Sequence, residues 1–140
     1  MDLDIKEAIR EKGLKITPVR LQVLRILSKD HLALSHADLE GSIEDADRIT
    51  LYRVLNDFEE AGLVHKVVDQ AGVARFAFCK SDCGHGHHAD NHVHFNCENC
   101  GKMFCLEKTE APAVKVPRGF KVAGQHTVVY GTCKDCTAQA

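Results

Sequence analysis

The chain has 140 residues, of which 44% are hydrophobic, and its formal net charge is −2. This length suits one ordinary domain or two small ones. The low net charge excludes a molecule that binds nucleic acid through its overall field, so any DNA affinity must come from a local patch. The first residues contain no long apolar run, and no later stretch has the length of a spanning helix. We therefore expect a cytoplasmic protein with no membrane partner.

Cysteine and histidine are unevenly distributed along the chain. Residues 1–78 contain no cysteine and three histidines, whereas residues 79–140 contain all seven cysteines and six histidines. Disulfides are rare inside cells, so metal binding is the first explanation for this many thiols, although one or two buried structural thiols would be ordinary. We predict one domain over residues 1–78 and a metal-binding domain over residues 79–140.

Three short helices are predicted before residue 44. The first ends near Gly13, which suits the position after a helix. Thr17 followed by Pro18 is typical of a helix start, and Ser35 with Asp38 forms an approximate capping box for the third helix. Their inward apolar positions are Ile5, Ile9, Val19, Val23, Ile26, Leu27, Leu39 and Ile43.

A fourth helix and a hairpin complete the first half. Residues 50–61 carry an apolar stripe at helical spacing, and Gly62 ends that helix. Two β-rich runs follow, Leu63 to Val68 and Arg75 to Cys79, joined by a turn over residues 69–72. Helices followed by a hairpin predict a winged helix-turn-helix. The inward stripe of the fourth helix is Leu51, Leu55 and Phe58.

The second half is predicted to be mainly strands. His92 to Phe95 alternates with a period of two, and Lys121 to Thr132 is a second β-rich run. The segment from Glu107 to Arg118 has two prolines and little helical periodicity, so we expect a loop there. The whole chain is thus predicted to be α+β, with a small α/β zinc-ribbon-like domain after the winged helix.

Basic residues at the start of the fourth helix are candidates for DNA contacts. A recognition helix needs donors and a flat apolar group where base edges and thymine methyls lie in the major groove. Basic residues near the second helix are candidates for phosphate contacts. The ordinary alternative is a solvated helical face, because the later part of the fourth helix is acidic. The candidate DNA-binding residues are Lys15, Arg20, Arg48, Tyr52 and Arg53.

Two CxxC pairs are the strongest chemical signal in the chain. Cys97 and Cys100 form one pair and Cys133 and Cys136 the other, with 32 residues between them. Each pair places two thiolates on one tight turn, and two pairs complete a tetrahedral site for Zn²⁺. Redox-active CxxC motifs usually occur singly, at a helix N-terminus. A closed four-thiolate site has no open coordination position, so this zinc is predicted to be structural.

The remaining thiols and imidazoles suggest a second, regulatory divalent metal. His92 and His94 project to one face of a strand, and Cys79, His65 and Cys105 are candidates for completing the site from both sides of residue 78. His65 is alternatively an exposed residue and Cys105 a core thiol. Candidates for an additional metal site are Cys83, His85, His87, His88, Asp90 and His126, although the loop around residues 83–88 could bind metal without consequence.

Several motifs together resemble the ferric uptake regulator superfamily over nearly the whole chain. They are residues 13–20 (GLKITPVR), 50–56 (TLYRVLN), 61–64 (AGLV), 92–101 (HVHFNCENCG) and 130–136 (YGTCKDC). The resemblance implies a homodimer that represses metal-uptake genes at palindromic operators, with a C-terminal dimerisation domain. It also implies that Tyr52, Arg53 and Lys15 contact DNA, that the CxxC cysteines hold structural zinc, and that His92 and His94 sense metal.

Within that superfamily the chain is most similar to the zinc uptake regulator branch. Cys79 and Cys105 stand where iron and peroxide sensors tend to have harder ligands, and thiolates favour Zn²⁺ over Fe²⁺ or Mn²⁺. The proline-containing stretch 107–118 replaces a family helix, and His126 lies about one residue from the family's late histidine. An iron or peroxide sensor is the alternative. A zinc-dependent nucleobase deaminase is disfavoured, because the chain has no His-x-Glu element and no Pro-Cys-x-x-Cys element.

Overall fold

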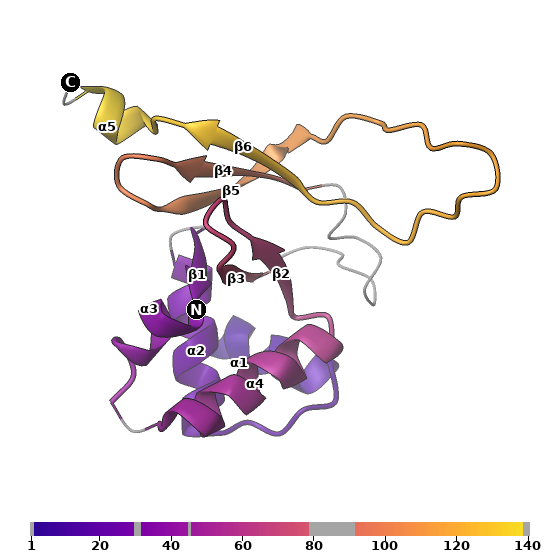
Figure 1. Cartoon of the computed structure of the whole chain (residues 1–140). Helices are drawn as coiled ribbons and strands as arrows, with labels where there is room; N and C mark the ends of the chain where they lie inside the picture. Colours follow the sequence, from indigo (N-terminus) through magenta and orange to yellow (C-terminus); the bar gives the residue numbers. More distant parts are fainter. Residues whose placement is uncertain (1, 30–31, 45, 79–91, 139–140) are drawn as a thin grey trace.

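The computed structural model describes residues 2–29, 32–44, 46–78 and 92–138. Within these ranges the N-terminal half is mainly helical, and a sheet joins it to the C-terminal half (Figure 1). None of the described helices is both long and apolar enough to cross a membrane. The N-terminal elements are α1 (Asp2–Glu11), α2 (Pro18–Lys29), β1 (Leu32–Ser35), α3 (His36–Glu40) and α4 (Arg48–Glu60).

The predicted end of α1 and the predicted starts of α2 and α3 are confirmed by local backbone geometry and hydrogen bonds. Gly13 adopts a left-handed φ of +76° just after α1. The Thr17 hydroxyl accepts a hydrogen bond from the backbone N–H of Arg20 at the start of α2 (3.2 Å). Ser35 and Asp38 satisfy each other's backbone N–H groups in a complete capping box before α3. These local bonds explain why short helices form at these positions.

Helix α4 starts two residues earlier than predicted, because Asp47 caps it. The backbone N–H of Thr50 donates to the Asp47 carboxylate at 2.7 Å. Hydrogen bonds from Thr50 hold the pKa of Asp47 below its ordinary value. The helix ends before Gly62, whose φ of +82° breaks the helical path. Because α4 begins directly after Asp47, the exposed Arg48 lies in its first turn, about one turn before the exposed Tyr52.

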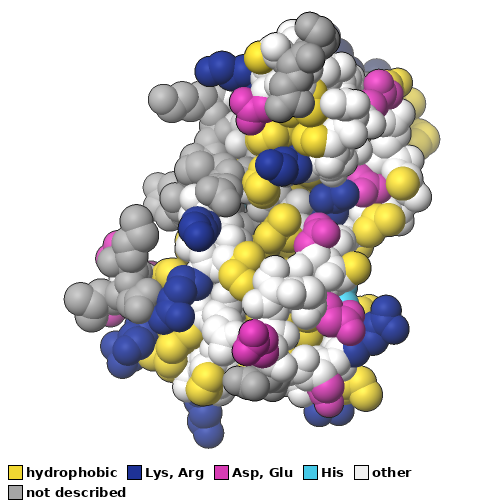
Figure 2. Space-filling model, turned by 90° about the vertical axis from the view of Figure 1, so that its left-hand side faces the viewer, with side chains coloured by type: hydrophobic (Ala, Val, Ile, Leu, Met, Phe, Trp, Pro, Cys, Tyr) yellow, Lys and Arg dark blue, Asp and Glu magenta, His cyan; other side chains and the backbone are white. Residues whose placement is uncertain are grey.

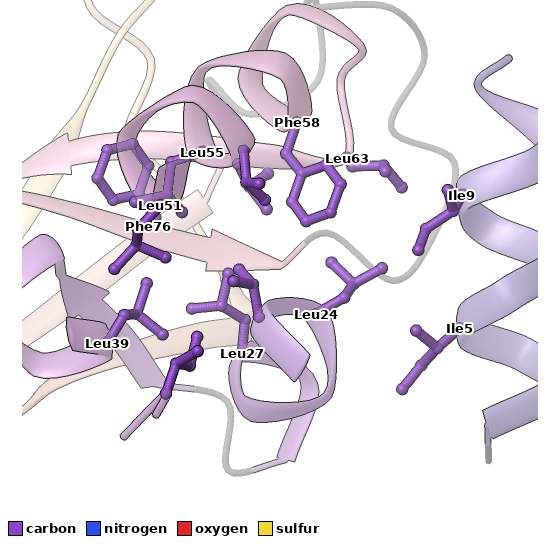
Figure 3. Packing of buried hydrophobic residues seen from close by; sticks show 14 residues of the cluster. Ile5, Ile9, Leu24, Leu27, Leu39, Leu51, Leu55, Phe58, Leu63 and Phe76 are labelled. Carbon is purple, nitrogen blue, oxygen red and sulfur yellow. The ribbon is translucent and has the colours of Figure 1, made fainter. Parts of the chain in front are cut away.

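The helices enclose one hydrophobic core, shown in Figure 3. The predicted stripe of α4 is buried, as are the inward positions of α1 and α3. Val19 and Ile26 are only half-buried, whereas Leu24 and Val54 are buried although they were not predicted to be. Burying each large side chain contributes about 1.5–3 kcal/mol. The largest fully buried members are Ile9, Leu24, Leu27, Leu39, Leu51, Leu55 and Phe58.

The predicted hairpin is formed by β2 (Val64–Val68) and β3 (Ala74–Phe78). The two strands pair antiparallel from Val64 opposite Phe78 to Val68 opposite Ala74. In the turn, the Asp69 carboxylate accepts hydrogen bonds from the backbone N–H groups of Ala71 and Val73, both at 2.9 Å. This hairpin is the wing of the winged helix.

Arg75 joins the wing to the rest of the N-terminal half. Its Nε donates to Asp69 at 2.8 Å, and its guanidinium also donates to the carbonyl oxygen of Ala33 in β1 at 3.3 Å. The same guanidinium lies 3.7 Å from Asp38 in α3. One half-buried cation therefore fixes the turn of the wing, the strand beside it and the capping residue of α3 relative to one another.

The C-terminal half contains β4 (His92–Cys97), β5 (Met103–Glu110), β6 (Thr127–Gly131) and α5 (Lys134–Ala138). The strand beginning at His92 is confirmed. The loop predicted from Glu107 was wrong at its start, because β5 pairs with β4 as far as Glu110. Residues 121–126 were predicted to be part of a strand but lie outside β6, and α5 was not predicted at all.

A single sheet runs through both halves in the order β2-β3-β1-β5-β4-β6. Strand β1 was not predicted, yet it holds the sheet together. Its Leu34 pairs with Phe76 in the wing, and its Ala33 pairs with Met103 in β5. Strand β4 pairs antiparallel with β5 and parallel with β6. The domain boundary near residue 78 therefore remains a prediction, since strand pairing crosses it.

Asp69→Asn should lower the free energy of unfolding by about 1–3 kcal/mol at neutral pH, because it removes the charge from a buried ion pair. Burial acts to raise the pKa of Asp69, but hydrogen bonds from Arg75, Val73 and Ala71 outweigh it and hold the pKa below 3.8. The carboxylate therefore stabilises the fold above about pH 4, and this contribution is lost as pH falls through the folded-state pKa. Urea unfolding should show that the free energies of unfolding of the parent and the variant become equal in acid. A difference between them that does not change with pH would contradict this.

Candidate functional site

The four cysteines of the two CxxC pairs come together at one end of the C-terminal sheet. Cys97 ends β4, Cys100 lies in the turn before β5, and Cys133 and Cys136 flank the start of α5. Their four sulfur atoms all lie within 4.8 Å of one another, and the Sγ atoms of Cys100 and Cys133 are 3.8 Å apart. Four sulfurs placed tetrahedrally about 2.3 Å from a zinc ion would be separated by about 3.8 Å. The arrangement fits a four-thiolate metal site.

Backbone amides prepare this cluster for a cation. The Cys97 sulfur accepts hydrogen bonds from the backbone N–H groups of Cys100 (3.4 Å) and Cys133 (3.3 Å). The first of these bonds contributes most to lowering the pKa of Cys97 to about 6. A hydrogen bond with Asn99 lowers the pKa of Cys136, but hydrogen bonding with Cys133 and burial outweigh it and raise the pKa to about 11. Metal binding must therefore displace protons from some thiols.

A second cluster joins the wing to the C-terminal sheet. It consists of His65 in β2, His94 in β4 and Cys105 in β5, whose ligand atoms lie within 4.8 Å of one another. The Nε2 atoms of the two histidines are 3.2 Å apart. Both rings are buried, with 5% of His65 and 1% of His94 exposed. Since His94 and Cys105 are paired across β4 and β5, the sheet presents two ligands and the wing brings the third.

Three of the five residues predicted for a regulatory site are thus brought together. Cys79 and the side chain of His92 lie outside what the structure describes, although the backbone of His92 starts β4. His126 is exposed and belongs to neither ligand cluster of the described chain. Five candidates for an additional metal site also lie outside the described residues: Cys83, His85, His87, His88 and Asp90.

The predicted DNA-binding residues of α4 lie on its exposed face. Arg48, Tyr52 and Arg53 are all exposed, and 58% of the Tyr52 surface is accessible. Lys15 is exposed in the loop between α1 and α2. Figure 2 shows Lys and Arg side chains projecting from the lower part of the molecule, where these helices lie. This face of α4 is thus exposed and rich in hydrogen-bond donors, and Arg48 also lies 3.8 Å from the Glu40 carboxylate.

Sequence reasoning missed His36, the first residue of α3. Its Nε2–H donates to the backbone carbonyl of Arg48 at 3.1 Å, and its ring lies 5.8 Å from the Tyr52 ring, centre to centre. His36 thereby supports the first turn of α4. No pattern in the sequence signalled this contact, because it joins two helices that only the tertiary fold places side by side.

The structure places Arg20 differently from the other candidates for DNA binding. Its guanidinium donates to the Asp57 carboxylate at 3.0 Å and to the backbone carbonyl of Lys15 at 2.7 Å. Only 17% of its side chain is exposed. Arg20 therefore holds the loop that carries Lys15 against α4. Its predicted contact with phosphate stays a prediction, and it would have to be made by a guanidinium that already has two partners.

Comparison with known proteins indicates the same class of protein as the fold and the two clusters of candidate ligands do. The ferric uptake regulator family model matches residues 11–130. The peroxide operon regulator of Bacillus subtilis is 34% identical over 141 residues, which cover 94% of this chain and 90% of that protein. The chain belongs to the ferric uptake regulator family. It is therefore a metal-responsive transcription regulator, and its relatives are named as regulators rather than as enzymes.

Solved structures of the family share the fold. A zinc uptake regulator complexed with zinc and DNA superposes with a TM-score of 0.67 at 24% identity, covering 99% of this chain and 93% of that one. The ferric uptake regulator of Vibrio cholerae gives a TM-score of 0.61 at 23% identity, covering 91% and 98%. The predicted winged helix followed by a small C-terminal α/β domain is thus confirmed as the fold class.

Arg20→Ala should lower the free energy of unfolding by about 1 kcal/mol, because it removes two hydrogen bonds that hold the loop to α4. The matched control is Lys15→Ala. The Lys15 side chain is exposed, so its removal should change stability by less than about 0.5 kcal/mol. Urea denaturation of both variants measures the difference. Equal stability of the two variants would show that Arg20 does not hold the loop.

Proposed function

We propose that this protein is a zinc-responsive, homodimeric transcription repressor that acts in the cytoplasm on genes for metal uptake. One observation carries the proposal: the wing and the C-terminal sheet contribute to one cluster of candidate ligands, with the buried His65 of the wing beside the buried His94 and the half-buried Cys105 of the sheet. An ion held there bonds to both halves at once. It therefore favours one position of the DNA-binding half over others, as a metal switch requires.

Two zinc ions serve different purposes in this proposal. The four thiolates of Cys97, Cys100, Cys133 and Cys136 form a closed structural site, whose binding energy stabilises the fold. The second ion is regulatory, and its imidazole and thiolate ligands suit Zn²⁺ better than Fe²⁺ or Mn²⁺. Cys79 and His92 are candidates for completing its coordination, since Cys79 directly follows the wing strand and His92 starts β4.

DNA is bound through α4 and the loop before α2. Tyr52, Arg48 and Arg53 lie on the exposed face that would enter the major groove, and the exposed Lys15 would contact the minor groove or the backbone. In a dimer, the regulatory ion would fix both winged helices at the spacing of a palindromic operator. The regulatory ion should strengthen operator binding by about 1–3 kcal/mol, and operator DNA must strengthen binding of the ion by the same amount.

Iron or peroxide sensing is the second candidate within the same family. It is supported by the 34% identity to the peroxide operon regulator of Bacillus subtilis, which exceeds the 24% identity to the solved zinc uptake regulator. The presence of Cys105 beside His65 and His94 favours zinc. Response to buffered Zn²⁺ and Fe²⁺ therefore separates the two candidates.

Replacing His94 by glutamine and Cys105 by serine should remove one bound zinc per chain and abolish zinc-dependent operator binding, while the structural zinc remains. His126→Gln is the matched control, because His126 is exposed and belongs to neither cluster. Metal analysis and a DNA-binding titration in buffered zinc measure both effects. Parental zinc response in the double variant would refute the switch, and a parental protein that responds to Fe²⁺ at lower free metal than to Zn²⁺ would move it to the iron-sensing branch.

Tyr52→Ala should reduce discrimination between operator and random DNA by about 1–3 kcal/mol, if the ring contacts bases. Lys15→Ala is the contrast, because a lost phosphate contact weakens binding to all DNA alike. It should flatten the dependence of log K on log salt by about one unit. Fluorescence anisotropy over a series of salt concentrations measures both quantities. Parental discrimination and salt dependence in both variants would show that α4 is not the recognition helix.

A further inference from the structure

The segment between β5 and β6, residues 111–126, has an unusual surface. We call it the arm; Figure 1 shows it extending to one side, away from helices α1–α4. It contains three basic residues and no acidic one. Its large apolar side chains are exposed, and Phe120 is the most exposed of them at 66%. Exposed apolar groups gathered in one segment mark a binding surface. They are Val114, Val116, Phe120 and Val122.

The arm is held in shape although its apolar side chains are exposed. At its base, the Gln125 side chain donates to the carbonyl of Pro112 at 2.9 Å. At its tip, the backbone N–H of Phe120 donates to the carbonyl of Pro117 at 3.1 Å, and Gly119 adopts a φ of +93° that closes the turn. Phe120 is therefore presented by a formed turn, which lowers the entropy lost when it binds.

The far end of the same sheet contains a hollow that suits an aromatic side chain. Its volume is about 480 Å³, and Phe95, Phe104 and Leu106 supply its apolar lining. Phe95 and Phe104 are paired across β4 and β5, and Cys105 and Cys133 line the hollow beside them. Thr132, Lys134 and Asp135 also line it, and these residues follow β6 in the chain. Hydrophobic side chains reach the surface in the upper part of Figure 2.

We propose that Phe120 of the arm binds in this hollow of a second copy of the chain, so that the two protomers exchange arms. The inference rests on the proposed function only in requiring a dimer. Within one chain Phe120 does not fill the hollow, because it is 66% exposed and is not among the residues that line the hollow.

Strand order supplies the geometric reason for a second copy. Strand β6 ends the order of the sheet, so among the described strands only β4 pairs with it. Two β6 strands paired antiparallel about a twofold axis would continue the sheet across both chains. Antiparallel pairing lays the residues that precede β6 in one copy beside those that follow β6 in the other. The arm of each protomer then reaches Thr132 to Asp135 of its partner, at the rim of the hollow.

The apolar surface of the edge strand agrees with this pairing. Lys115, Arg118 and Lys121 make the arm basic, and the hollow is lined by one residue of each charge, Lys134 and Asp135. Val129 and Tyr130 of β6 are also exposed, so the apolar surface continues from the arm along the edge strand. An aromatic anchor in an apolar pocket, with charges at the rim, is the common design of a binding hot spot.

Phe120→Asp tests the exchange in the full-length, zinc-loaded protein. It should weaken dimerisation by at least about 30-fold, the effect typical of losing a hot spot. Val68→Asp is the matched control, because Val68 is 53% exposed at the end of the wing strand β2 and should not affect dimerisation. Sedimentation measures the dimer constant, and circular dichroism checks that both variants fold. Equal dimerisation of the two variants would overturn the proposal.

Tryptophan fluorescence gives a second readout, because the chain contains no tryptophan. In Phe120→Trp the emission maximum should shift to the blue as concentration rises through the dimer constant, whereas in Val68→Trp it should not move. One outcome is a protein that dimerises and binds DNA in zinc while the emission at position 120 stays that of a solvent-exposed tryptophan. That result overturns the exchange but leaves the proposed function intact. A protein that remains monomeric overturns both, and one that exchanges arms without responding to metal overturns only the proposed function.

Discussion

The contact between His65 and His94 joins the two halves of this protein. The Nε2 atoms of the two imidazole rings lie 3.2 Å apart inside the molecule. One ring belongs to the wing and the other to the C-terminal sheet, and Cys105 lies beside them. Polar groups are costly to bury unless they find partners, so these side chains constrain one another strongly. A metal ion bonded to all three would replace weak contacts by coordination bonds at the point where the wing meets the sheet.

Strand pairing and side-chain hydrogen bonds also link the wing to the C-terminal sheet near His65 and His94. Strand β1 pairs with the wing on one side and with β5 on the other, so a displacement of the wing must disturb the sheet that holds Cys105. Arg75 ties the turn of the wing to β1 through Ala33. The backbone N–H of Gln70 in the same turn also donates to the Asn96 side chain at 3.4 Å, and Asn96 donates to the carbonyl of Lys102 beside the cysteine turn. The wing thus touches the surroundings of both ligand clusters.

Some parts of the site were predictable because their chemistry is local. Each CxxC pair brings two thiolates onto one turn at a spacing that hardly depends on the rest of the fold, so the four-cysteine cluster could be expected from residues 97–100 and 133–136 alone. The roles of Arg20 and His36 could not be. The Arg20 guanidinium faces Asp57, 37 residues later, and the His36 ring faces Tyr52, so neither contact leaves a pattern in the neighbouring sequence.

Local signals in the sequence were sufficient to predict helices α1 to α4, the wing and the candidate metal-binding cysteines and histidines, because caps, turn glycines and apolar periodicity act over a few residues. Thr17, Asp69 and Gly62 carry that information locally. Three features depend instead on contacts between distant parts of the chain: Leu32 to Ser35 forms a strand, β5 extends to Glu110, and residues 121–126 do not form a strand with β6. Strand formation requires a partner for the backbone N–H and C=O groups, and that partner comes from a distant part of the chain.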